Sequence, residues 1–105
     1  MPDKSLADGQ IANSSTVVYT VPESVVSVKL TYLALFQTHA TTQTITVHIQ
    51  RHGSTSRQVG RWSLKQNQRG HEFVDAPPFL SPGDKLLLGT TTASAVDFTL
   101  SGTET

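Results

Sequence analysis

The chain has 105 residues, in which eight Lys plus Arg balance eight Asp plus Glu, and it has no cysteine. This length fits one domain with one hydrophobic core. Zero net charge and a charged fraction of 15%, below the usual ~25%, leave little electrostatic attraction to nucleic acid or anionic lipid. The missing thiols exclude disulfides and thiolate sites.

Residues 1–8 are polar and show no periodicity, which predicts a frayed N-terminal arm ahead of one domain over residues 9–105. No apolar segment at the start of the chain reads as a secretory signal, and no run approaches the ~18 residues of a membrane span. We therefore expect a protein made in the cytoplasm.

From Gly9 onward apolar and polar residues alternate with period two, the pattern of strands that bury one face. The first predicted strand, 15–22, sets Val17, Tyr19 and Val21 on one face. The second, 25–37, sets the even-numbered residues from 26 to 36 on the core face, which leaves Leu33 and Leu35 on the other. The third, 42–52, directs Ile45, Val47 and Ile49 inward.

Shorter strands are predicted at 57–64, 71–76, 84–90 and 95–102. In the last of these Val96, Phe98 and Leu100 share the core face. In 84–90, Leu86 and Leu88 face the core and Leu87 faces outward. Residues 81–84, Ser-Pro-Gly-Asp, fit a type II turn, because Pro supplies its fixed φ and Gly the positive φ.

The chain therefore reads as seven or eight strands with no helix longer than one turn. That pattern predicts a single antiparallel β-sandwich, of either the jelly-roll or the immunoglobulin-like type.

Six residues form the candidate protein interface. The predicted outward leucines are Leu33, Leu35 and Leu87, and a basic stretch contributes Arg57, Arg61 and Trp62. The alternatives are that isolated leucines are simply exposed and that Trp62 folds into the core beside a solvated edge strand. Binding of single-stranded nucleic acid by stacking and charge ranks behind both.

No group of residues predicts catalysis, a cofactor or a metal. His48 and His52 lie on one face of a predicted strand about 13 Å apart, too far for one ion. No nucleophile elbow is present, and Asp84 falls in a turn where its side chain can accept hydrogen bonds from backbone amides.

Two segments resemble small β-domain proteins of tailed-bacteriophage virions. VVYTVPESVVSVKLTYLALFQTHATTQTITVHI (17–49) is similar to their opening, with a Tyr-Thr-Val-Pro strand end, a long hydrophobic strand, a polar loop and a Thr-rich strand. LSPGDKLLLGTTTASAVDFTLSGTE (80–104) is similar to their ending, with a Pro-Gly-Asp corner and a last strand into Ser-Gly. Glu23-Ser24 stands where Ala-Gly is usual, and Gln37-Thr38-His39 where Asn-Thr is usual.

The resemblance implies a non-enzymatic structural protein of the virion, assembled in the bacterial cytoplasm. Its expected role is capsid decoration (cement), binding and stabilising the head shell. The expected partners are the major capsid protein or other virion proteins, with self-association, for instance as a trimer. Because few charges are available, we expect binding to depend little on salt.

The alternative is a tail, neck or fibre component that joins virion parts or binds a host surface receptor. Sugar receptors are bound by exposed aromatic rings, and the pattern places Tyr19 and Tyr32 on core faces. That placement favours the structural role over sugar binding.

Overall fold

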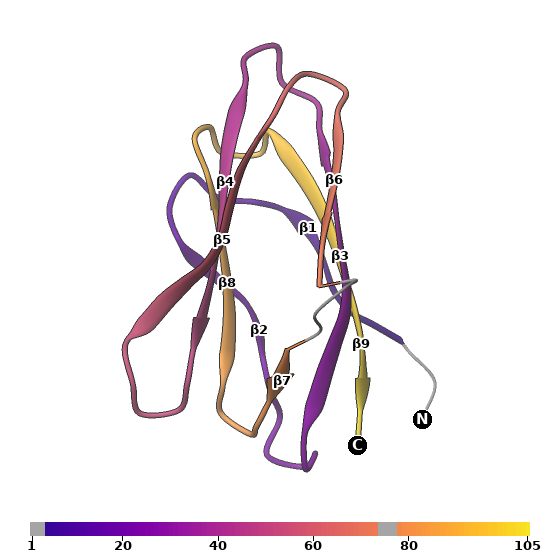
Figure 1. Ribbon diagram of the computed structural model, residues 1–105, viewed down its shortest axis with the longest axis vertical. Coiled ribbons are helices and arrows are strands. Elements are labelled where there is room, and N and C mark those ends of the chain that lie inside the picture. The colour runs from indigo at the N-terminus through magenta and orange to yellow at the C-terminus, as the bar shows by residue number, and fades with distance from the viewer. Residues whose placement is uncertain (1–3, 74–77) are drawn as a thin grey trace.

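The computed structural model describes residues 4–73 and 78–105, and this part of the chain forms nine strands in two antiparallel sheets (Figure 1). The strands are β1 (Lys4–Gln10), β2 (Thr16–Thr20), β3 (Val28–Gln37), β4 (Gln43–Gln50), β5 (Ser56–Leu64), β6 (Arg69–Glu72), β7 (Phe79–Leu80), β8 (Lys85–Thr90) and β9 (Val96–Glu104). The predicted antiparallel sandwich is confirmed. Of the strand predicted at 71–76, residues 71 and 72 lie in β6, and residues 74–76 lie outside the described residues.

The strand order is that of a jelly roll. Sheet A has the order β1-β9-β3-β6, with β7 also pairing with β3, and sheet B has the order β2-β8-β4-β5. The chain passes from one sheet to the other at every connection except β4–β5 and β6–β7. Two sheets whose strands alternate along the chain in this way, each with four strands in its main order, distinguish the jelly roll from the immunoglobulin-like alternative. No helix occurs in the described part of the chain, so none there is long and apolar enough to cross a membrane.

The core lies between the inner faces of the two sheets. The six residues predicted to share one buried layer are all buried: Ile45, Val47, Ile49, Val96, Phe98 and Leu100. They come from β4, an inner strand of sheet B, and β9, an inner strand of sheet A. Period-two alternation therefore predicted these strands correctly.

In β3 the prediction that Leu33 and Leu35 point outward is wrong. Both are buried, with relative exposures of 0% and 3%. A β-bulge lies between Leu30 and Tyr32, where β3 pairs with β9, so Thr31 is an extra residue. A bulge shifts the side-chain alternation by one position. Leu33 and Leu35 consequently enter the core, and Tyr32 is turned outward, 42% exposed.

The prediction that Leu87 is an exposed residue is also wrong. Its neighbours Leu86 and Leu88 face the core as predicted, but Leu87 is only 8% exposed. The reason is that β8 lies inside sheet B, where Leu87 pairs with Val17 of β2 on one side and with His48 of β4 on the other. Cross-strand neighbours on both sides cover it.

The described part of the predicted N-terminal arm is a strand. Residues 4–8 belong to β1, which pairs along β9 and has its own bulge between Ser5 and Ala7. Leu6 and Ala7 pack against the core, and Lys4 forms an ion pair with Glu104. The polar composition of residues 4–8 did not predict a strand, because β1 is an edge strand in which only Leu6 and Ala7 are partly buried.

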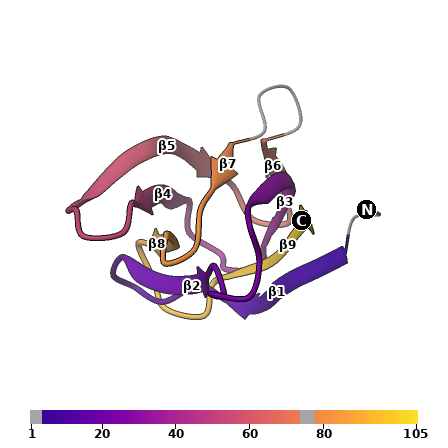
Figure 2. The same cartoon turned by 90° about the horizontal axis from the view of Figure 1, so that it is seen from below.

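The two long sides of the sandwich differ (Figure 2). On one side β1 and β2 lie next to each other, and Tyr19 of β2 donates a 2.8 Å hydrogen bond to Glu104 of β9. Burial, reinforced by the Glu104 carboxylate, raises the pKa of Tyr19, and hydrogen bonds from Lys4 and then Tyr19 lower the pKa of Glu104. On the other side β5 ends sheet B, and β6 and β7 end sheet A.

Candidate protein interface

Three of the six predicted interface residues lie together on β5. Arg57 and Arg61 are exposed, and Trp62 is half-buried against the core. The other three, the leucines of β3 and β8, are buried and take no part. We call Arg57, Val59, Arg61 and Trp62, with the backbone of β5, the basic edge.

The backbone of β5 is free for pairing along one side. Among the described residues β5 pairs only with β4. The register shifts between Val47 and His48, which leaves Val59 as a bulged residue with no residue opposite it. Val59 is 51% exposed, so the edge presents an apolar side chain. Arg57 lies on the inner face of sheet B beside Ile49, and Arg61 lies on the outer face beside Thr46. Bulges and charged side chains commonly protect an edge strand from unspecific pairing with other chains. A bulge also bends the strand and changes the direction of its side chains.

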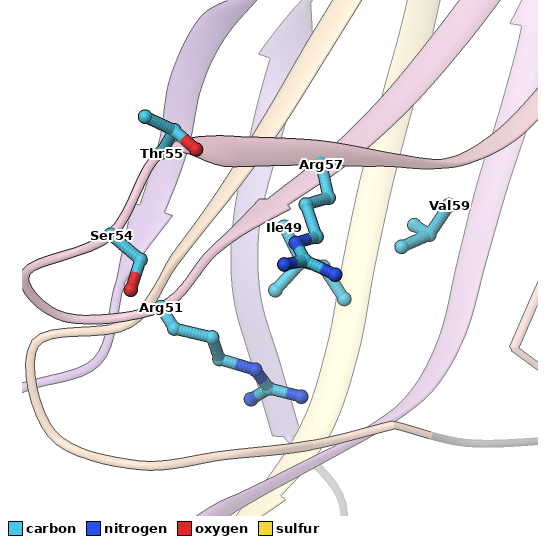
Figure 3. A pocket seen from close by; sticks show the side chains of 6 residues that line it. All are labelled: Ile49, Arg51, Ser54, Thr55, Arg57 and Val59. Carbon is cyan, nitrogen blue, oxygen red and sulfur yellow. The ribbon is translucent and has the colours of Figure 1, made fainter.

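A hollow of about 510 Å³ opens at the hairpin end of the basic edge (Figure 3). Arg57 pairs with Ile49 across the β4–β5 ladder, so both side chains lie on the inner face of sheet B. In the figure the guanidinium groups of Arg51 and Arg57 reach into the space beside Ile49, and Val59 lies at its other end. The hollow therefore combines an apolar wall with two cationic groups.

Arg51 is held in place by Asp84 of the β7–β8 turn. Its guanidinium donates 3.0 Å and 2.8 Å hydrogen bonds to Asp84 Oδ2 and to the carbonyl of Phe79. Burial of the Asp84 carboxyl favours a raised pKa, but hydrogen bonds from the amides of Ser81 and His52 and from Arg51 outweigh it and lower the pKa. Arg51 is thus a neutralised structural cation. Arg57 has no hydrogen bond or ion pair within the described residues, so its charge is available to a partner.

Trp62 fits the edge because the facing strand has a glycine. A Cβ on Gly70 of β6 would lie 3.0 Å from Trp62 Nε1 and 3.2 Å from Leu64 Cδ2. Trp62 pairs with Ile45, so its ring lies on the inner face, between the ends of the two sheets. It supports the edge from inside rather than offering a free ring to solvent.

Charge is unevenly placed along the chain. Residues 51–71 contain no Asp or Glu and hold five of the eight Lys and Arg: Arg51, Arg57, Arg61, Lys65 and Arg69. This segment forms the end of the β4–β5 hairpin, β5 and the start of β6. A protein with zero net charge therefore has a positive side, which attracts acidic partners locally.

A second surface, which we call the outer hollow, lies on the exposed face of sheet A and has a volume of about 480 Å³. Its side chains stand in two cross-strand rows. In one row Phe36 is flanked by Asp97 of β9 and Arg69 of β6; in the next, Ala34 is flanked by Thr99 and His71. In the second row the short side chains of Ala34 and Thr99 form the floor, and the ring of His71 stands beside them.

An aromatic pair closes the other end of the outer hollow. The rings of Tyr32 and His71 are nearly parallel, with centroids 6.1 Å apart and an interplanar angle of 15°. Sequence reasoning missed this surface because it placed Tyr32 and Phe36 in the core. The available signal was that residues 32–36 are apolar at both parities, so alternation alone did not determine which set was buried.

The described residues contain no group of three or more His, Asp or Glu side chains arranged to hold a metal ion. His48 instead lies 3.4 Å from the hydroxyl of Ser15, through Nδ1. The features described above are those of binding surfaces.

No known protein family and no curated protein is detectably similar to this chain. The surfaces themselves therefore carry the functional argument, together with the resemblance in sequence noted above.

Proposed function

We propose that the protein is a non-enzymatic structural protein of a tailed-phage virion, a decoration (cement) protein that docks on the head shell through the basic edge. The observation that carries this proposal is the edge strand β5, which pairs with β4 on one side and carries the exposed residues Arg57, Val59 and Arg61. Arginine is among the residue types that most often anchor a protein interface. The expected partner surface on the major capsid protein is acidic.

The same edge supports a protein partner better than a nucleic acid. Single-stranded nucleic acid is bound by exposed rings on which bases stack. Trp62 is packed against the core instead, and Arg51 is already paired with Asp84. An edge strand can in addition accept a strand of the partner by main-chain hydrogen bonds, which nucleic acid cannot supply.

This placement changes one expectation from composition. The low charged fraction predicted contacts that depend little on salt. Because the cations cluster on the basic edge, we now expect docking to weaken as salt rises from about 50 mM to about 500 mM, a range over which charge interactions at a surface are progressively screened.

The alternative is a tail, neck or fibre component that binds a host surface receptor. The observation that favours it is the exposure of Tyr32, whose expected burial had argued against sugar binding. The two roles use different faces of the sandwich.

Docking is tested with particles from which the protein has been removed, by measuring the bound fraction after sedimentation. We expect the double variant Arg57→Glu/Arg61→Glu to lose about tenfold or more in affinity. The matched control is Lys29→Glu/Lys85→Glu, which makes the same change in net charge on β3 and β8 and should bind within about twofold of the parent.

Equal binding by the two double variants would contradict docking through the basic edge. So would tight binding of the parent protein to a single-stranded oligonucleotide combined with no binding to shells.

A further inference from the structure

We propose that the outer hollow binds an acidic sugar, a pyranose ring that bears a carboxylate. In this arrangement Arg69 receives the carboxylate, Tyr32 and Phe36 cover the apolar C–H face of the ring, and Asp97 and Thr99 bond its hydroxyls. This proposal does not rest on docking on a shell, because it uses residues of β3, β6 and β9 in sheet A, whereas the basic edge is strand β5 of sheet B.

The first argument is the shape of the surface. Residues two apart on a strand are separated by about 7 Å, so the rows of Phe36 and Tyr32 lie on either side of the low row that contains Ala34. Aromatic side chains at both ends, with Ala34 and Thr99 between them and the ring of His71 at one side, make a slot about one ring wide. Because three adjacent paired strands carry it, the slot is rigid before any ligand binds (Figure 1).

The second argument is the placement of charge. Arg69 and Asp97 lie on opposite sides of Phe36, two strand spacings or about 10 Å apart along the row. Neither forms an ion pair or a side-chain hydrogen bond with any described residue, and both are exposed. The slot therefore has a cationic end, supplied by Arg69 of β6, and an anionic end, supplied by Asp97 of β9.

The third argument is the match between these groups and one class of ligand. A planar guanidinium binds a carboxylate through two parallel hydrogen bonds. A carboxylate such as Asp97 accepts hydrogen bonds from neighbouring hydroxyls. A uronic acid has a carboxylate at one end of the ring, hydroxyls at the other end and an apolar C–H face between them. Arg69, Phe36 and Asp97 stand across the slot in the matching order.

A protein partner fits the slot less well. The centre of a protein interface is depleted of charge, which is confined to the rim. Here the charged groups Arg69 and Asp97 stand inside the hollow, on either side of Phe36. Hydrogen-bonding groups arranged around a single ring-sized space are instead typical of a small-molecule site.

The test uses the full chain in solution and trigalacturonate as the probe, followed by NMR chemical shifts. We expect saturable shifts at Ala34, Thr99 and the ring of Tyr32, with a dissociation constant of about 1 mM, an ordinary affinity for a shallow site. The neutral probe, a trisaccharide of galactose, should bind about tenfold more weakly because it lacks the carboxylates.

Variants separate the outer hollow from general attraction of polyanions to the basic edge. Arg69→Gln and Tyr32→Ala should each weaken trigalacturonate binding about tenfold, whereas Arg57→Glu/Arg61→Glu should leave it within about twofold. Both positions are on the surface, and dispersion of the NMR spectrum verifies that each variant is folded. Should Tyr32→Ala be misfolded, the shift map of the parent protein still decides the matter.

Three results would overturn the proposal: no saturable shift with trigalacturonate, shifts confined to β5, or equal affinity for the acidic and neutral probes. Loss of shell docking in the basic-edge variant with retained sugar binding would count against neither proposal. Loss of both in that variant would contradict a separate sugar site.

Discussion

Asp84 shows how one buried carboxylate organises a corner of the fold. It accepts 2.9 Å and 2.8 Å hydrogen bonds from the amides of Ser81 and His52, and a bond from Arg51. The turn itself is as predicted, with Gly83 at φ 88° and a 3.0 Å bond from the Asp84 amide to the Ser81 carbonyl. Asp84 thereby fastens the β7–β8 turn to the β4–β5 hairpin.

Replacing Asp84 by Asn should lower the free energy of unfolding at neutral pH by about 2 kcal/mol, since one charge-assisted acceptor is lost. Most of this effect comes from the amide bonds, because Arg51 is largely exposed and its ion pair is screened. Chemical denaturation of both proteins at pH 7 measures the difference, and an unchanged midpoint would contradict this role.

The same carboxylate predicts how stability depends on pH. The folded state lowers the pKa of Asp84 below its ordinary value. Its contribution is therefore present above about pH 4 and is lost as the pH falls through the folded-state pKa. Denaturation curves taken across this acid range should show a steeper loss of stability for the parent than for Asp84→Asn. Parallel curves would refute the assignment.

Gly102 allows the close approach of two strands at the β3 bulge. A Cβ at this position would lie 2.5 Å from the Lys29 carbonyl oxygen and 2.8 Å from Leu6 Cδ1. Because a backbone atom cannot simply move aside, Gly102→Ala should destabilise the protein by about 1–3 kcal/mol. The control is Ser101→Ala at the adjoining position. Thermal unfolding of the two variants should differ clearly, and equal melting temperatures would contradict the close approach.

The sequence pattern predicted β2, β3, β4, β5, β8 and β9, missed the edge strand β1, and assigned the wrong face where a bulge interrupts the alternation of a strand. Period two identified β4 and β9 and their buried faces, because each has apolar residues at one parity alone. It assigned the second half of β3 to the wrong face, since residues 32–36 are apolar at both parities and Thr31, which forms the bulge, has no local signature. Because Tyr32 and Phe36 were placed in the core, the sequence pattern did not predict the outer hollow.

The candidate site was predicted only in part, for a related reason. Arg57, Arg61 and Trp62 were identified from residue type, and the structure brings them together on β5. The burial of Leu87 depends on which strands flank β8, and sheet order is a property of long-range pairing that local alternation does not contain.

Strand β1 is predicted to be part of the fold rather than an appendage. Deleting residues 1–8 removes most of β1 and exposes one edge of β9, so the midpoint of chemical denaturation should fall markedly and β9 amides should exchange faster. Lys4→Ala, which removes only the exposed ion pair with Glu104, should cost no more than about 1 kcal/mol. If the deletion behaved like Lys4→Ala, pairing of β1 would be unimportant to stability.

For the whole molecule, the two candidate surfaces belong to different sheets and adjoin where β5 faces β6. The basic edge lies at the end of sheet B and the outer hollow lies on the exposed face of sheet A, and Arg61 and Trp62 line one hollow together with Arg69 and His71. A shell-bound protein with a free sheet A would hold its sugar site toward the medium. Self-association through either surface is detectable by light scattering, and the two sets of variants identify which one is used.

The central claim, that the protein decorates a phage head, is tested most directly by its copy number in purified virions. Quantitative mass spectrometry, with the major capsid protein as the internal standard, measures this number. The account predicts copies in a fixed ratio to the capsid subunits and of the same order. A handful of copies per particle would point to the tail, neck or fibre instead, and absence from the virion would contradict the account altogether.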